Sequence, residues 1–393
     1  MNKKLNIVFI GDMSYPEGMA STKRVRNIIE SLKKFNPIIN VIVIRQQNVE
    51  NSNGTYKNHK YYIVAPNKTI LQAILIFPII IFKLIFQIFK LKQYDCKNII
   101  YKYESPSIFD TIPVIFAKII GYKIIYDIVE DVNFAYSSTN NLIHRIKITI
   151  AILLTNMMHL WTDAILYISN NLGIKFQKFN VKYLKKLYYQ PISIDFKIFE
   201  KEIKVNRNEI VLFYGGSFGS KDCVENLIYA FNNVAEKKYN VKLKLSGKGD
   251  KYQENFIFNI IKKSKHQERI HFLGYLDDDK YLYELKSSDI LCMIRSNSGY
   301  SNAGFPFKLG EYLATGKPVI ATKVSDIPLL FTDKKEIYLI EANSVDLLES
   351  NIEFIINNYQ KSAKIGNLGK KKARTLFDIE NQGYKLFNFL RDL

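Results

Sequence analysis

The chain has 393 residues, of which 47% are hydrophobic and 24% are charged. This composition excludes a disordered or fibrous protein, and the length exceeds that of one typical core. Lys and Arg outnumber Asp and Glu by 56 to 37, which gives a formal net charge of +19. Such a charge favours a polyanionic partner: nucleic acid, an anionic membrane or a phosphorylated small molecule. Because no zinc-finger spacing or RNA-binding signature accompanies the charge, we expect no nucleic-acid partner.

The cysteines and the N-terminus indicate a reducing compartment. Cys96, Cys223 and Cys292 are far apart and odd in number, so we expect neither a disulfide framework nor a metal site. Residues 5–10 follow the N-terminus directly as a strand-like segment, and their apolar run is too short for a signal peptide. We therefore expect a cytoplasmic protein.

Strand-like segments alternate with helical ones, which predicts an α/β fold of parallel sheets with crossover helices. In the first half these segments are 5–10, 39–44, 61–64, 98–101, 123–126 and 164–168. In the second half they are 209–214, 241–245, 270–273, 289–294, 319–322 and 337–340. The intervening residues 195–208 are polar and charged, so we predict one domain over 1–200, a second over 201–377 and a final helix over 378–393.

A glycine-containing loop precedes the first predicted helix. Gly18 permits close backbone approach, and the helix N-terminus that carries Ser21 and Arg24 could face a ligand. The alternative is an ordinary helix capped by Ser21 or Thr22 with solvated basic residues.

Two apolar helical segments follow. Residues 70–91 are long enough to suggest a membrane span, but Pro78 interrupts them, and we expect four polar side chains to project to one side of the helix. Those side chains are Gln72, Lys83, Gln87 and Lys90. Residues 146–160 form a second apolar segment, and a run of lysines follows between residues 175 and 186. This pattern predicts peripheral binding to an anionic cytoplasmic leaflet. The alternative is that both helices simply cover the first sheet.

The second half contains a glycine-rich turn between a strand and a helix. Gly215, Gly216 and Ser217 offer backbone N–H groups, and Lys221 offers an ammonium, so the turn could hold a diphosphate. A plain tight turn is the alternative. After the strand at 289–294, Arg295 begins a polar run at the position where doubly wound folds bind ligands.

Residues 305–322 join a short helix to a buried strand. Lys308 and Glu311 are three apart and share one helical face, and Gly316 stands where a left-handed cap ends a helix. An ammonium at a helix N-terminus attracts an anion, and a carboxylate one turn later accepts hydrogen bonds from vicinal hydroxyls. This pairing suits a phosphorylated sugar, although an ordinary surface salt bridge has the same spacing.

Lys308, residues 311–314 and residues 316–320 resemble the donor-site segment of the retaining glycosyltransferases of family 4. The resemblance implies a GT-B fold, in which two Rossmann-like doubly wound parallel-sheet domains face a cleft and a final helix crosses back to the first domain. It implies that Glu311 binds the ribose of a nucleotide sugar. Residues 245–249, with Gly247, resemble the next donor-side loop of that family.

The same resemblance implies roles for further residues, and the chain departs from the family pattern at two positions. It assigns Lys221 and Lys308 to the diphosphate and the loop with Gly18, Ser21 and Arg24 to the acceptor. Family members carry a Glu eight positions before the ribose Glu, but this chain has Ala303, so Arg295 and its neighbours become candidates for the sugar. Where relatives carry a His the chain has Val129, and Glu130 or Asp127 is our candidate for that contact.

Together these observations predict a retaining, metal-independent glycosyltransferase without a cofactor. It would move a sugar from a nucleoside diphosphate sugar to a glycan or lipid-linked acceptor, with a role in cell-surface polysaccharide synthesis at the inner face of the membrane. One alternative is a nucleotide-sugar 2-epimerase of the same fold, and another is a degenerate, non-catalytic subunit. The sequence leaves the sugar, the base and the linkage open.

Overall fold

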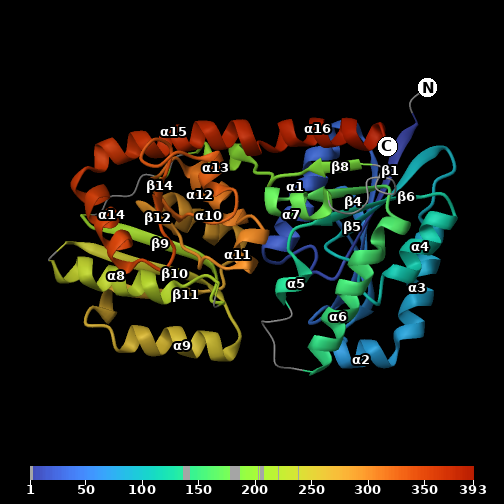
Figure 1. The fold of residues 1–393 in the computed structure, drawn as a ribbon, viewed down its shortest axis with the longest axis horizontal. Helices are drawn as coiled ribbons and strands as arrows, with labels where there is room; N and C mark the ends of the chain where they lie inside the picture. Colours follow the sequence, from blue (N-terminus) through green and yellow to red (C-terminus); the bar gives the residue numbers. More distant parts are fainter. Residues whose placement is uncertain are drawn as a thin grey trace. The chain divides into compact units, whose positions relative to one another are not determined.

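The structure is a computed structural model that describes residues 3–135, 142–177, 186–201, 203, 208–219, 221–237 and 239–393. The chain forms two compact units. The first comprises Met1–Ser193 together with Ile379–Leu393, and the second comprises Ile194–Asp378. Each unit is built on one mainly parallel sheet covered by helices, which confirms the predicted α/β class with two parallel-sheet domains (Figure 1).

The sheet of the first unit has eight strands in the order β3-β4-β2-β1-β5-β6-β7-β8. All neighbouring strands are parallel except β3 and β4, which are antiparallel. The strands are β1 Lys4–Gly11, β2 Ile38–Gln46, β3 Asn53–Tyr56, β4 His59–Pro66, β5 Cys96–Tyr103, β6 Lys123–Ile128, β7 Ala164–Tyr167 and β8 Lys186–Tyr189. The six predicted strands are confirmed. The two that were missed, β3 and β8, are four-residue strands at the edges of the sheet, where little burial marks the sequence.

Helices cover both faces of this sheet. They are α1 Ala20–Leu32, α2 Ile70–Leu75, α3 Phe77–Lys90, α4 Thr111–Ile119, α5 Val132–Ala135, α6 Leu142–Met157, α7 Asn170–Gln177 and α16 Ile379–Arg391. The connection through α1 runs toward the β3 edge, whereas those through α3, α4 and α6 run toward the β8 edge. Right-handed crossovers therefore place α1 on one face and α3, α4 and α6 on the other. Helix α16 packs on α1, and its Phe387 stacks on Phe35, just after α1, with ring centroids 4.2 Å apart.

The apolar segment 70–91 is two helices rather than one helix broken at Pro78. Thr69 forms a capping box with Gln72 at the start of α2, the helix ends before Ile76, and Pro78 occupies the first turn of α3. Proline is tolerated there because the first-turn N–H groups have no helical partner. The predicted polar side is corrected at Gln87, whose amide nitrogen is buried. Among the residues that the structure describes, no helix combines the length and the apolarity that a bilayer crossing requires.

The sheet of the second unit has six parallel strands in the order β11-β10-β9-β12-β13-β14. The strands are β9 Ile210–Ser217, β10 Val241–Lys248, β11 Ile270–Gly274, β12 Ile290–Met293, β13 Val319–Thr322 and β14 Tyr338–Ile340. All six correspond to predicted segments. The helices are α8 Val224–Glu236, α9 Lys251–Lys262, α10 Asp278–Ser287, α11 Gly299–Ala303, α12 Phe307–Thr315, α13 Ile327–Leu330, α14 Val345–Asn357 and α15 Tyr359–Phe377. Helix α8 packs against α14, and α12 packs against α15.

The junction between the units differs from the predicted one after residue 200. Residues 194–200 belong to the second unit, because Ile194 donates its N–H to the carbonyl of Phe377 at 2.8 Å. Phe196 is buried, and the guanidinium of Arg374 lies 5.8 Å from its ring centre. The residues 202 and 204–207 of the expected linker lie outside the described residues.

Candidate functional site

The second unit has a topological switch point between β9 and β12. From β9 the chain moves to β10 and β11 on one side, and from β12 it moves to β13 and β14 on the other. Ligands in doubly wound folds bind at the carboxyl ends of the strands beside such a point. Strand β9 ends in the glycine turn Gly215–Ser217, and Arg295 follows β12. The two predicted segments are therefore adjacent.

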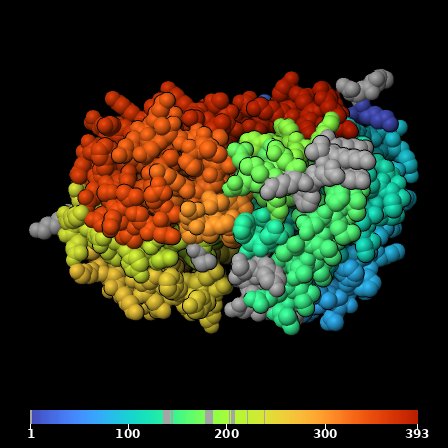
Figure 2. Space-filling model, viewed as in Figure 1, coloured from blue at the N-terminus to red at the C-terminus, as the bar shows by residue number. Residues whose placement is uncertain are grey.

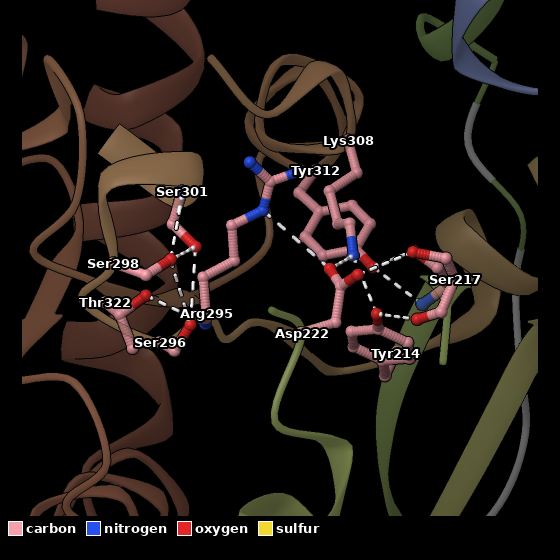
Figure 3. A network of polar contacts seen from close by, with 11 residues as sticks. Tyr214, Ser217, Asp222, Arg295, Ser296, Ser298, Ser301, Lys308, Tyr312 and Thr322 are labelled. Atoms are coloured by element: carbon pink, nitrogen blue, oxygen red, sulfur yellow. Dashed lines mark hydrogen bonds and ion pairs between the residues drawn. The ribbon is translucent and has the colours of Figure 1, made fainter. Parts of the chain in front are cut away.

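A carboxylate that the sequence did not single out lies at the centre of this site. Asp222 is 1% exposed, and its Oδ1 lies 3.0 Å from the ammonium of Lys308 and 3.7 Å from Nε of Arg295. Ser217 donates its hydroxyl to the other oxygen of Asp222 at 2.5 Å. Lys308 also donates to the hydroxyl of Tyr214 at 2.9 Å (Figure 3). We call these five residues the Asp222 network.

The surroundings lower the pKa values of both Asp222 and Lys308. Burial alone would raise the pKa of Asp222, but Lys308, Arg295 and the Ser217 hydrogen bond lower it below its ordinary value. Burial lowers the pKa of Lys308 to about 8, since lost solvation outweighs the attraction of Asp222, and Arg295 adds repulsion. Below that pH two cations face one carboxylate, so the network keeps a positive charge for an incoming anion.

The glycines of the turn allow backbone and side chains to approach closely. A Cβ on Gly216 would overlap the ammonium of Lys308. Gly247, at the end of the neighbouring strand β10, has φ +138°, and a Cβ there would overlap the carbonyl oxygen of Gly216. Gly215 donates its N–H to the hydroxyl of Tyr312 at 2.7 Å, which ties the turn to α12. Gly247 is therefore required for packing against the turn, whichever ligand the turn binds.

Helix α12 positions Lys308 and Glu311 one turn apart, as the sequence predicted. Pro306 is its N-cap, and Gly316 ends it in the left-handed conformation with φ 77°. Glu311 accepts a hydrogen bond from the hydroxyl of Tyr281 at 3.4 Å. An ionised carboxylate is an acceptor for hydroxyl donors.

Lys221 lies beside the network. Its carbonyl accepts the N–H of Ser296 at 2.8 Å, and its ammonium lies 4.2 Å from the ring centre of Tyr300. Ser220, the residue before it in the predicted turn, lies outside the described residues.

The predicted polar run after β12 forms a serine cluster. Ser296, Ser298 and Ser301 lie within hydrogen-bond distance of one another, from 3.1 to 3.5 Å. Arg295 projects between this cluster and Asp222 (Figure 3). Ala303, where the resemblance leads one to expect Glu, is buried.

In the first unit, the structure corrects the predicted role of Arg24 as an acceptor contact. Its guanidinium is 3% exposed and donates to both oxygens of the buried Asp127 at 2.7 and 2.8 Å. It also donates to the carbonyls of Gln190 and Pro191 at 3.0 and 3.2 Å. A buried, bidentate pair of this kind joins α1 to β6, so we assign Arg24 to the core of the unit rather than to an acceptor.

The other predicted residues of the first unit lie around the start of α1 and after β6. Met19, not Ser21 or Thr22, is the N-cap of α1, and Ser21 lies in the first turn of the helix. Thr22 donates its hydroxyl to the carbonyl of Ser14 at 2.5 Å, and a Cβ on Gly18 would overlap that hydroxyl. Glu130 is exposed just after β6, at the carboxyl edge of the sheet.

The second unit is similar in sequence to a known protein family. Residues 195–372 match the family described as Glycosyl transferases group 1. The second unit is a group 1 glycosyltransferase domain. No curated protein matches the chain in sequence.

Solved glycosyltransferase structures extend the likeness to the whole fold. Sucrose-phosphate synthase from Thermosynechococcus elongatus is 13% identical with a TM-score of 0.78, over 98% of each chain. HepE of Anabaena in complex with UDP-glucose is 16% identical with a TM-score of 0.71, over 98% of this chain and 100% of that chain. The E. coli trehalose-6-phosphate protein bound with UDP-2-fluoro glucose is 9% identical with a TM-score of 0.70, over 99% of each chain. The two units therefore have the GT-B glycosyltransferase fold.

Asp222 and Tyr214 were missed by the sequence analysis. Tyr214 belongs to a strand pattern that predicts only core. Asp222 directly follows the predicted phosphate lysine, and an acidic residue at that position was the one available signal. Their ion-pair and hydrogen-bond partner Lys308 lies 86 to 94 residues away in the sequence, so no local spacing marked them.

Proposed function

We propose that this glycosyltransferase moves a hexose-type sugar, with retention of configuration, from a UDP-sugar to a glycan or lipid-linked acceptor in cell-surface polysaccharide synthesis. Uridine is proposed because the similar HepE and E. coli structures contain UDP-glucose and UDP-2-fluoro glucose. The observation that carries the proposal is the Asp222 network at the switch point, with Glu311 one turn further along α12.

The diphosphate, the ribose and the sugar of the donor each have a proposed contact. The diphosphate would contact the cations Lys308, Arg295 and Lys221 and the N–H groups of Gly216 and Ser217. The ribose hydroxyls would donate to Glu311. The serine cluster would supply hydroxyls to the sugar in place of the Glu that is absent at residue 303. Gly247 would keep the neighbouring backbone clear of the diphosphate.

In the proposed step, the bond between sugar C1 and the β-phosphate oxygen breaks while a bond forms between C1 and the acceptor oxygen. The acceptor proton passes to an oxygen of the leaving diphosphate, so no protein base is required. Negative charge grows on that diphosphate, where Lys308 and Lys221 stabilise it. Because these cations supply charge compensation, we propose that the step is metal-independent and uses no cofactor.

The first unit is proposed to bind the acceptor. Gly18 and Ser21 lie in the loop and first turn of α1, and Glu130 follows β6 as the proposed contact to the sugar or acceptor. We propose a cytoplasmic protein that works at the inner face of the membrane, where lipid-linked acceptors are displayed.

The proposal is tested by a panel of nucleotide sugars. The protein should gain thermal stability with one UDP-sugar, because a ligand that binds only the folded state raises the melting temperature. The stabilising donor, offered with candidate acceptors and an excess of chelator, should yield a product whose anomeric configuration equals that of the donor by NMR. Epimerised free sugar nucleotide would identify a 2-epimerase, and binding of no nucleotide sugar would identify a degenerate subunit.

Donor affinity should decrease above pH 8. The empty site loses the Lys308 proton as the pH rises through about 8, and the anionic diphosphate binds the protonated form better. Titration calorimetry with the stabilising UDP-sugar should show constant affinity from pH 6 to 7.5 and a loss of up to about tenfold per pH unit above 8. Lys308→Arg should remove this dependence, since arginine stays charged. An affinity that does not change up to pH 9.5 would contradict the assignment.

A further inference from the structure

Helix α3 has two apolar faces, and only one of them packs on the protein. Ile80, Leu84 and Ile88 recur at helical spacing and are buried against the first unit. The opposite side carries a second apolar stripe of exposed residues. They are Leu75 at the end of α2, 82% exposed, followed by Ile79 at 54%, Phe82 at 69%, Phe86 at 58% and Phe89 at 56%. A helix that only covers a sheet needs the first face and not the second.

The neighbouring helices repeat this arrangement. Helix α4 packs on α3 and exposes Ile112 and Ile119. Helix α6, on the same face of the sheet, exposes an apolar stripe at helical spacing that consists of Leu142, Ile146, Leu153 and Met157. Residues of α6, in green, and of α3, in light blue, both lie at the surface in Figure 2. The outer face of this layer is therefore apolar over three helices, which for a folded chain marks an interaction surface.

The helices of this layer carry basic residues and no acidic ones. Residues 51–94 contain no Asp or Glu, and neither do the helices α4 and α6. Lys83 and Lys90 are exposed and border the Phe82, Phe86 and Phe89 stripe on one side of α3. Beyond the end of α3, the ammonium of Lys92 lies 5.4 Å from the ring centre of the exposed Tyr94. Lysines and a tyrosine beside an apolar stripe are the arrangement of helices that lie in a bilayer interface.

We propose that the outer face of α2, α3, α4 and α6 binds an anionic phospholipid bilayer, with the phenylalanines of α3 inserted and Lys83 and Lys90 at the headgroups. Charge complementarity favours a bilayer over a second copy of this chain, because two copies would bring their lysines together. Membrane binding depends on the proposed function in one respect only: it would bring the enzyme to a lipid-linked acceptor. Binding itself requires neither donor nor acceptor.

Vesicle sedimentation of the full chain, without nucleotide or acceptor, tests this. The protein should sediment with phosphatidylcholine vesicles that contain 25% phosphatidylglycerol and much less with phosphatidylcholine alone. Lys83→Glu/Lys90→Glu should lower partitioning by about thirtyfold or more, because each lysine near such a surface contributes about 1 kcal/mol. Phe82→Glu/Phe86→Glu should abolish binding. Salt at 1 M should weaken binding of the unchanged protein by screening the lysines.

Matched variants in the second unit serve as controls. Lys251→Glu/Lys371→Glu changes the net charge equally at exposed positions, and Tyr252→Glu/Phe256→Glu changes two exposed aromatics of α9. Both should bind vesicles as the unchanged protein does, and all variants should keep donor-induced thermal stabilisation. The proposal is overturned if the folded protein does not bind anionic vesicles, or if the control variants lose as much binding as the α3 variants. It is also overturned if sedimentation velocity shows a dimer that Phe82→Glu/Phe86→Glu dissociates without any lipid binding.

Discussion

Replacing Lys308 by methionine should lower the sugar-transfer rate by about 10²-fold or more. The ammonium is the cation that lies 3.0 Å from Asp222 and beside the glycine turn, so in the proposed site it meets the diphosphate as negative charge develops. Methionine keeps most of the side-chain volume and removes only the charge and the hydrogen bonds. The measurement is kcat/KM with the stabilising UDP-sugar at pH 7, where Lys308 is protonated.

The same substitution also affects folding, and a second variant separates the two effects. Lys308→Met leaves the carboxylate of Asp222 buried with a weaker set of partners, which costs up to about 3–5 kcal/mol of folding free energy. Lys308→Met/Asp222→Asn removes the unpaired charge and should recover most of that stability. If the double variant is stable and still inactive, the ammonium acts on the donor. If the double variant recovers both stability and rate, Lys308 serves only the fold.

Glu311→Ala should weaken UDP-sugar binding by about 1.5–3 kcal/mol, which is about 10- to 150-fold in Kd. The proposed ribose contact is a pair of hydroxyl hydrogen bonds to an ionised carboxylate, and such bonds exceed neutral ones in strength. The hydroxyl of Tyr281 donates a hydrogen bond to this carboxylate at 3.4 Å. Calorimetric titration with UDP should show the same loss, because the ribose is common to UDP and to the UDP-sugar.

Two variants bracket the effect of Glu311. Tyr281→Phe removes the hydroxyl that positions the carboxylate and should weaken binding less than tenfold. Glu341→Ala removes an exposed carboxylate that pairs with Lys323 in the same unit and should leave the affinity unchanged. Unchanged UDP affinity in a folded Glu311→Ala protein would place the ribose elsewhere.

Local features of the sequence were enough to predict most strands of both sheets. The six strands of the second unit and six of the first are apolar runs of ordinary strand length, separated by helical segments. Helix α12 was also predicted from local features, because Gly316 ends it and the three-residue spacing of Lys308 and Glu311 places them on one face. The edge strands β3 and β8 were not predicted, because a short strand with few buried residues has no comparable hydrophobic pattern.

The tertiary structure alone decided which charges meet. Lys308 and Asp222 are 86 residues apart, and Arg24 and Asp127 are 103 apart, so no periodicity in the sequence relates them. The sequence predicted a ligand contact for Arg24, but the fold pairs it with a buried carboxylate. Asp222 was not predicted as a site residue, because it meets Arg295 only when β12 lies beside β9. Strands and helices follow from neighbouring residues, because burial and backbone hydrogen bonding repeat along the chain. A charge network follows from strand order, because burial makes each ionised group depend on a partner that only the fold can bring near.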